Sequence, residues 1–133
     1  MAQFELITPP GLPQPTGYSH VARISPGSRL VWTSGQVAIA ADGTLPLATD
    51  WEAQTRQAMR NVGLALAAGG ATWDDVFKLT FYVVDTSELD AVRAVRDEFV
   101  NLTVPPASSL VRVAGLFRPE LLIEIEAVAA VVE

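Results

Sequence analysis

Hydrophobic and polar positions alternate with a two-residue period near the end of the chain, in Leu121–Val132. This alternation predicts a β-strand, because successive side chains on a strand point to opposite faces of a sheet. One face of this strand would be wholly apolar, whereas the other would carry Glu124 and Glu126 among apolar residues. A strand so apolar on both faces is typical of a sheet interior or a subunit interface.

The two glutamates of this strand need an explanation, because a carboxylate that is buried without a partner costs free energy. Each requires a cation, a set of hydrogen-bond donors or a bound proton. Glu124 and Glu126 either reach solvent near a sheet edge, or form structural ion pairs with Arg112 or Arg118, or include one buried acid that faces a cleft. The pattern of residues leaves these alternatives open.

Other segments have the β-branched and aromatic composition of strands. They are Phe4–Ile7, Tyr18–Ile24, Leu30–Ser34, Val76–Val84 and Ser108–Ala114. Val76–Val84 contains no glycine or proline, which predicts a central strand. Ser108–Ala114 is followed by a turn around Gly115–Glu120, so we expect it to form a closing hairpin with Leu121–Val132.

Apolar residues at helical spacing predict two α-helices. The first would begin at a capping box formed by Thr49 and Glu52 and would end about five turns later at the glycine pair Gly69-Gly70. The second is expected over Glu88–Val100. Its inner stripe consists of Leu89, Val92, Val95 or Arg96, and Phe99.

The order of these elements predicts an α+β fold, as a single domain over residues 1–133, with both helices on one face of the sheet. The other face would then be bare. Because Leu30–Trp32, Phe77–Val84 and Leu121–Val132 have apolar residues on both faces, we expect other subunits to cover it.

Charge and hydropathy exclude several classes of function. The net charge of −6 and the isoelectric point near 4.7 disfavour nucleic-acid binding, which depends on neutralising phosphates. The sequence has no dense cluster of Lys and Arg for a membrane surface and no apolar run of about 18 residues for a membrane span. It also begins without the pattern of a signal peptide, so the expected location is the cytoplasm.

The chain offers few groups for metal binding or nucleophilic catalysis. It contains no cysteine and one histidine, His20, so we expect neither a disulfide nor a metal site built from cysteine or several histidines. Phosphate-binding loops and the nucleophile-elbow pattern are also missing. Ser19 and His20 would point to opposite faces of a strand, which disfavours a serine–histidine pair and places His20 at a surface or rim.

Six short motifs occur in an order that is specific for one protein family, although no single motif identifies that family. They are Tyr18-Ser19, Thr33-Ser34-Gly35-Gln36, Ala67–Thr72, Val76–Thr80, Pro106-Ala107-Ser108-Ser109 and Ile123–Ala127. Together they resemble the RidA family, also called YjgF/L-PSP. The resemblance runs from about Tyr18 to Val132.

This resemblance implies a chorismate-mutase-like fold, with a mixed β-sheet backed by two helices and assembled as a homotrimer. Sites in the family lie in clefts between neighbouring subunits. The best-known members hydrolyse reactive enamines and imines, such as 2-aminoacrylate, to a keto acid and ammonia, without a metal or an organic cofactor. The expected ligand is therefore a small molecule.

The resemblance also assigns roles to particular residues. Glu124 matches the acid that positions or activates water, and Glu126 has no matching role, so it is expected to be structural. Tyr18 and Ser34 match substrate-binding positions. Two further substrate-binding positions are occupied by Ser87, where many members have asparagine, and Leu110, where cysteine is frequent.

This sequence departs from the family at one motif. Deaminating members have Pro-Ala-Arg-Ser, and the arginine of this motif binds the substrate carboxylate. Here Ser108 stands at the arginine position, and the loss of such a contact costs several kcal/mol. Arg112 lies about 13 Å along the same strand face. Arg118 or an arginine of a neighbouring subunit is another candidate for a replacement.

Two functions therefore remain. One is an imine or enamine hydrolase with an altered substrate, and the other is a trimeric ligand-binding module without catalysis. Ribonuclease activity, which has been attached to some members, is disfavoured by the acidic charge and the lack of a basic groove.

Overall fold

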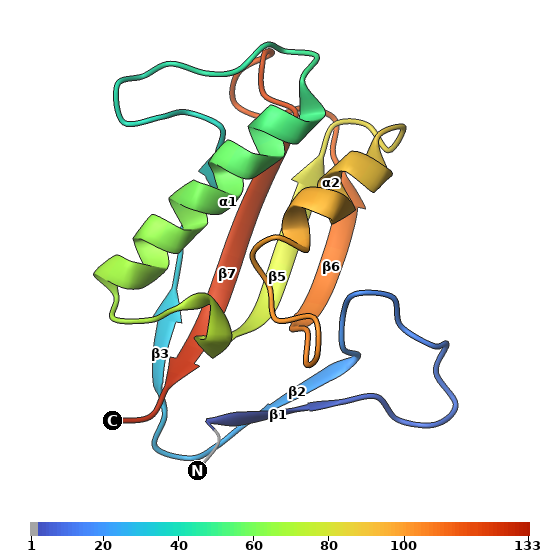
Figure 1. Ribbon diagram of the computed structural model, residues 1–133, viewed down its shortest axis with the longest axis vertical. Helices are drawn as coiled ribbons and strands as arrows, with labels where there is room; N and C mark the ends of the chain where they lie inside the picture. Colours follow the sequence, from blue (N-terminus) through green and yellow to red (C-terminus); the bar gives the residue numbers. More distant parts are fainter. Residues whose placement is uncertain (1–2) are drawn as a thin grey trace.

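The computed structural model describes residues 3–133, which form a mixed β-sheet, a separate β-ribbon and two α-helices (Figure 1). The elements are β1 (Phe4–Ile7), β2 (Val21–Ile24), β3 (Arg29–Trp32), β4 (Gln36–Val37), α1 (Trp51–Ala68), a 3-10 turn (Trp73–Asp75), β5 (Val76–Val83), α2 (Leu89–Arg96), β6 (Ala107–Arg112) and β7 (Ile123–Val131). The ribbon consists of β1 and β2, and the remaining five strands form the main sheet. In the described part of the chain, no helix is long and apolar enough to cross a membrane.

The main sheet has the strand order β3-β7-β5-β6, and β4 also pairs with β7. Strand β7 is antiparallel to its neighbours, whereas β5 and β6 are parallel. The predicted closing hairpin is therefore wrong, because β5 lies between β6 and β7. The chain passes from β5 to β6 through α2, and such a crossover returns it parallel to the strand it left. Strand β7, apolar on both faces, then takes a central place.

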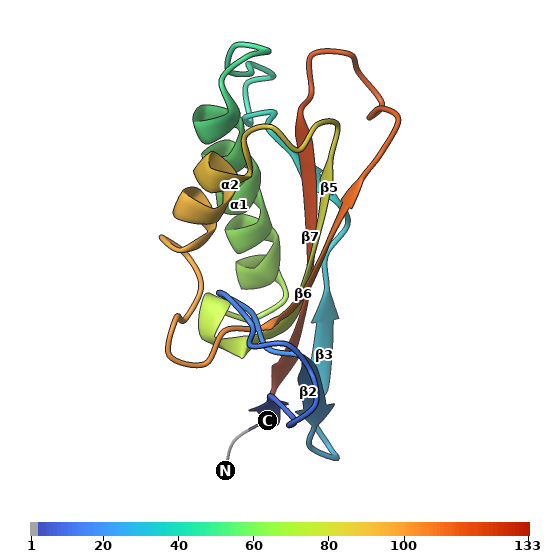
Figure 2. The same ribbon diagram turned by 90° about the vertical axis from the view of Figure 1, so that its right-hand side faces the viewer.

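Both helices cover the same face of the sheet, as the sequence predicts (Figure 2). Ile123, Ile125 and Ala127 of β7 point toward the helices and are fully buried. Leu79 and Val83 of β5 lie beside them in the same core. Alternation along the strands thus builds the core between the sheet and the helix layer.

The opposite face of the sheet carries large apolar side chains that this chain does not cover. Trp32 is 71% exposed and Leu30 is 51% exposed on β3, and Val111 of β6 is 44% exposed. Glu124 and Glu126 lie on this face and are half-buried. We call it the open face.

The start of α1 differs from the prediction by one residue. Asp50 caps the helix, because its carboxylate accepts a hydrogen bond from the backbone N–H of Ala53 at 2.9 Å. Glu52 does not reach back to Thr49 but lies 3.3 Å from Arg56, one turn along the helix. Aspartate and threonine are both good caps, so backbone geometry decides between adjacent candidates.

The second helix is shorter than predicted, since it ends at Arg96 and not near Val100. The N–H groups of Glu98 and Phe99 bond to carbonyl groups three residues back, which tightens the chain into a turn. Val92 and Val95 are buried against the sheet, and Arg96 on the same side is only 9% exposed. An arginine is therefore part of the inner surface of this helix.

Candidate functional site

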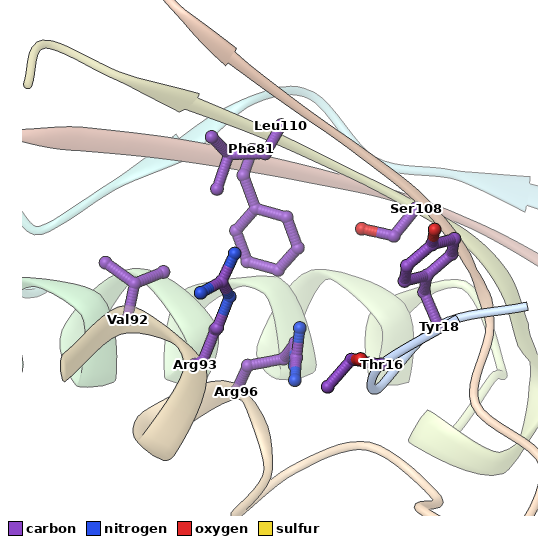
Figure 3. Close-up of a pocket in the computed structure, with 8 residues that line it drawn as sticks. All are labelled: Thr16, Tyr18, Phe81, Val92, Arg93, Arg96, Ser108 and Leu110. Atoms are coloured by element: carbon purple, nitrogen blue, oxygen red, sulfur yellow. The ribbon is translucent and has the colours of Figure 1, made fainter. Parts of the chain in front are cut away.

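A cavity of about 240 Å³ lies between α2 and the edge strand β6 (Figure 3). Its lining residues are Thr16, Tyr18, Phe81, Val92, Arg93, Arg96, Ser108 and Leu110. Drug-sized ligands occupy cavities of about 300–1,000 Å³, so this volume suits a smaller molecule. Three predicted substrate-binding residues, Tyr18, Ser108 and Leu110, lie together here.

Strand β6 contributes Ser108 and Leu110 because of its register with β5. Ser108 is paired with Leu79 and Leu110 with Phe81, and both of these β5 residues point to the helix layer. Phe81 and Val92 are themselves buried core residues and supply the apolar part of the lining. Within residues 3–133, β6 is the last strand of the main sheet on this side, and only an isolated bridge from Ser19 to Ala107 lies beyond it, so the cavity lies at an edge of the sheet.

Tyr18 reaches the cavity from a loop. The prediction of a strand that begins at Tyr18 is wrong, because β2 begins only at Val21. Gly17, just before it, has a φ of +75°, a backbone conformation that favours glycine. Ser19, just after it, donates its hydroxyl to the carbonyl of Pro105 at 2.6 Å. This bond ties the loop to the chain that leads into β6.

His20 is held at the rim of this loop, as expected. Its Nε2 lies 2.7 Å from the carbonyl oxygen of Pro13, and its ring meets that of Tyr18 edge-on, with 5.2 Å between centroids. The hydroxyl of Ser19 bonds to a backbone carbonyl. Neither side chain is arranged for a serine–histidine pair.

Neither arginine of the cavity, Arg93 or Arg96, was predicted from the sequence to bind a ligand. Both come from α2, where Arg96 is buried and Arg93 is half-exposed. The signal that would have found Arg96 is its place in the predicted inner stripe, where a cation requires a specific reason. Two guanidinium groups therefore lie on the α2 side of the cavity.

Glu124 and Ser34 lie away from this cavity, on the open face. The carboxylate of Glu124 sits against Gly35, so closely that a Cβ atom at that glycine would overlap it. Ser34 is the exposed residue just before Gly35. These two predicted site residues are therefore neighbours, but strand β5 and the thickness of the sheet separate them from Ser108.

Glu126 has a partner on the adjacent strand. The hydroxyl of Tyr82 donates a hydrogen bond to the Glu126 carboxylate. This bond raises the pKa of Tyr82, and burial and the charges of Glu126 and Glu124 raise it further. The bond is in keeping with a structural role for Glu126.

Arg118 and Arg112, the expected ion-pair partners of Glu124 and Glu126, do not contact these glutamates. Arg118 bonds to Glu120, with 2.9 Å from its Nε, so the ion pairs proposed between the β7 glutamates and Arg118 or Arg112 do not occur in the described residues. Arg112 is exposed at the end of β6. Its charge helps to lower the pKa of Asp85, although hydrogen bonds from Ser87 lower it more.

Ser87, the last of the predicted site residues, is exposed in the turn between β5 and α2 and does not line the cavity. Its backbone N–H donates to the carboxylate of Asp85 at 2.6 Å. One chain thus places its predicted site residues at separate positions: a cavity with Tyr18, Ser108 and Leu110, and an acidic group on the open face. Residues 3–133 contain no cluster of three or more His, Asp or Glu side chains positioned to hold a metal ion.

Comparison with solved structures supports the fold. The chain is similar to YyfB of Yersinia pestis, a protein of unknown function of the conserved Rid family, with a TM-score of 0.83 and 34% identity, over 98% of this chain and all of that one. It is also similar to Escherichia coli TdcF with bound serine, with a TM-score of 0.68 and 29% identity, over 97% of this chain and 98% of that one.

Sequence comparison identifies the family. The chain is 36% identical over 113 residues to a 2-iminobutanoate/2-iminopropanoate deaminase of Salmonella typhimurium, which covers 83% of this chain and 85% of that protein. The sequence model of the family described as endoribonuclease L-PSP matches residues 12–131. The chain therefore belongs to the endoribonuclease L-PSP family, the RidA or YjgF family that its motifs resemble.

Proposed function

We propose that the protein is a deaminase that hydrolyses small imines or enamines, and that it acts as a cytoplasmic homotrimer with sites between subunits. The observation that carries this proposal is the cavity that gathers Tyr18, Ser108 and Leu110 from a loop and a strand far apart in the sequence. Glu124 lies on the open face of the same chain. A neighbouring subunit that covers this face would bring its own cavity to the acid.

Hydrolysis of an imine requires that a proton be moved twice. Water adds to the carbon of the C=N bond while one of its protons goes to nitrogen, which gives a tetrahedral product with a hydroxyl and an amino group. The hydroxyl proton then moves to nitrogen as the C–N bond breaks, and ammonia and the carbonyl compound are released. We assign these transfers to the Glu124 carboxylate, which accepts a proton from water and returns it to the leaving nitrogen. An enamine first takes a proton on carbon to become the imine.

The remaining residues would bind the substrate. Tyr18 and Ser108 supply hydroxyl groups inside the cavity, and Leu110 and Phe81 supply apolar contact. Ser34 lies beside Glu124, so it would reach the substrate from the neighbouring subunit together with that acid. Ser87 would contact the substrate only if the neighbouring subunit packs against the turn between β5 and α2. Because Ser108 carries no charge, we propose that the substrate is bound differently from that of the arginine-bearing members.

The second candidate is a trimeric ligand-binding module without catalysis. Ser108 favours it, because a serine in place of a charged carboxylate ligand weakens the hold on an imino acid. This alternative uses the same cavity and needs no proton transfer by Glu124.

A turnover assay separates the two functions. Imines generated freshly from amino acids and from amines would be given to the wild type, Glu124→Gln and Glu126→Gln, and the release of ammonia and carbonyl product would be followed. We expect Glu124→Gln to lose at least about 100-fold in rate, since a positioned acid–base group contributes about 10²–10⁴. Glu126→Gln is the matched control, because its amide oxygen still accepts the bond from Tyr82.

Two results would contradict the deaminase. Full activity in Glu124→Gln would remove the acid from the mechanism. A folded wild-type trimer that accelerates neither series of imines would leave the binding module as the function.

A further inference from the structure

The positive charge of the cavity comes from α2 and not from β6. We infer that Arg96, assisted by Arg93, binds the carboxylate of the substrate in place of the arginine that is missing at Ser108. This inference rests on the proposed function and specifies its substrate class: small imino acids, whose carboxylate is held at the helix wall of the cavity.

The guanidinium of Arg96 is oriented by Asp97. Its Nε donates a hydrogen bond to Oδ1 of Asp97 at 3.0 Å, and its Nη2 forms an ion pair with the same oxygen at 2.9 Å. An arginine has five N–H groups, so the two on Nη1 and the second on Nη2 remain for another acceptor. These groups form the end-on fork that matches the two oxygens of a carboxylate.

A loop packs against the same guanidinium. Gly17 approaches Arg96 so closely that a Cβ atom at this glycine would overlap Nη2 and Cζ of the guanidinium. The next residue in the loop is Tyr18, which lines the cavity. Contact with the loop limits the movement of Arg96, so little conformational entropy remains to be lost when a ligand binds.

The ion pair with Asp97 does not by itself compensate for the burial of the Arg96 charge. The side chain is 11% exposed, whereas its partner Asp97 is 40% exposed and is the next residue in the chain. A buried charge with a partly solvated partner recovers little of its desolvation cost. A carboxylate that enters the cavity would supply the missing compensation.

Arg93 adds positive charge beside this fork. It lies one helical turn from Arg96, on the same side of α2, and its Nη1 is 4.0 Å from the fully exposed Asp90. That contact is weak, because exposed ion pairs are screened by water. A ligand carboxylate in the cavity would therefore meet two neighbouring guanidinium groups.

Ser108 completes the arrangement. In Figure 3 its hydroxyl and the guanidinium of Arg96 point into the same space from β6 and from α2. A second guanidinium at position 108 would therefore face Arg96, and like charges repel. Serine at 108 leaves room for the ligand and offers it one hydrogen bond, so the residues at 96 and 108 are complementary.

Ligand binding tests this inference without any need for turnover. Hydrolysis of 2-iminopropanoate yields pyruvate, so the probes are pyruvate and its neutral counterpart pyruvamide, measured by calorimetry on the full chain. We expect the wild type to bind pyruvate at least about tenfold more tightly than pyruvamide, because bonds to charged groups are the stronger ones. Arg96→Gln should abolish this preference, and Arg96→Lys should retain part of it.

The matched control is Arg60→Gln, which removes the same charge from an exposed position on α1 and should leave both affinities unchanged. Ser108→Arg, added to Arg96→Gln, should restore the preference for pyruvate. Arg93→Gln should reduce it by a smaller factor. Circular dichroism would show that each variant is folded.

Equal binding of pyruvate and pyruvamide by the wild type would overturn the inference, even if an Arg96 variant fails to fold. A preference that persists in folded Arg96→Gln would also overturn it. These outcomes are distinct from failure of the proposed function: a chain that binds pyruvate through Arg96 but hydrolyses no imine keeps the inference and loses the deaminase. A chain that hydrolyses imines but shows no preference for a carboxylate keeps the deaminase and loses the inference.

Discussion

The two faces of the main sheet are built from the same strands, but the helices of the chain cover only one of them. On β7, Ile123 and Ile125 are fully buried beneath the helices, whereas Glu124 between them is half-buried on the open face. On β3, Val31 belongs to the core and Trp32 is exposed. One face is completed by its own chain, and the other carries large apolar groups without cover.

This difference separates stability from function. The helix-covered face holds the apolar core that stabilises each subunit, and its margin at β6 forms the cavity. The open face carries Glu124 and the apolar surface that we assign to the homotrimer. A change in the buried core should act on folding, a change at Trp32 should act on assembly, and a change at Glu124 should act on catalysis.

The largest effect is expected in the core. Ile125→Ala should lower the free energy of unfolding by about 2–5 kcal/mol, because it leaves a cavity among fully buried residues. Urea denaturation followed by circular dichroism measures this change. Leu47→Ala is the control, because Leu47 is 75% exposed in a loop and should cost less than about 0.5 kcal/mol. Equal effects of the two would contradict the assigned core.

The next effect concerns assembly. Trp32→Ser should weaken the proposed homotrimer at least about tenfold, because large aromatic residues dominate interface energies. Sedimentation velocity across a range of concentrations would detect the dissociation. Leu64→Ser is a matched control, since Leu64 is also 71% exposed but lies on α1. A wild type that is monomeric, or equal effects of the two variants, would contradict the assignment of the open face to an interface.

A third change acts on Glu124 without altering the acid itself. In Gly35→Ala the new methyl group would displace the carboxylate of Glu124, and we expect the rate of imine hydrolysis to fall about 100-fold. Gly35 does not have a positive φ and the displaced group ends a flexible side chain, so the fold should persist.

Gly115→Ala is the corresponding control, because a Cβ atom there meets no neighbour within 4 Å. The comparison requires kcat and the melting temperature of both variants. A Gly35→Ala protein with unchanged kcat would show that the position of Glu124 does not matter to the reaction.

The smallest effect concerns the hydrogen bond on the open face. Tyr82→Phe removes the donor to Glu126 and should cost about 1 kcal/mol of stability. The pKa of Tyr82 is raised above its ordinary value of 10, first by this bond. The stabilisation is therefore complete below about pH 10 and is lost as the pH rises through the higher pKa of the folded protein.

Unfolding free energies measured between pH 7 and pH 11 would test this prediction. The wild type should lose its advantage over Tyr82→Phe at the alkaline end of the range. A constant difference across the whole range would show that the hydroxyl contributes by packing and not through its proton.

Much of the fold was determined by the sequence itself. The two-residue alternation of Leu121–Val132 and the helical spacing after Trp51 depend only on local geometry, so they predicted the strand, the helix and the faces they bury. The same alternation placed Glu124 and Glu126 on the less protected face. The family motifs identified the residues at the cavity, because Tyr18, Ser108 and Leu110 can be matched without knowing where they lie.

Only the tertiary structure decided which elements meet. Strand β5 separates β6 from β7, and a pairing between strands far apart in sequence has no local signal, which is why the expected hairpin was wrong. The same holds for Arg96: an arginine on a short helix is ordinary in sequence, and it becomes a candidate carboxylate ligand only because α2 packs it opposite Ser108 and beside the loop of Gly17. Local periodicity determined the direction of each side chain, and long-range packing determined what it faces.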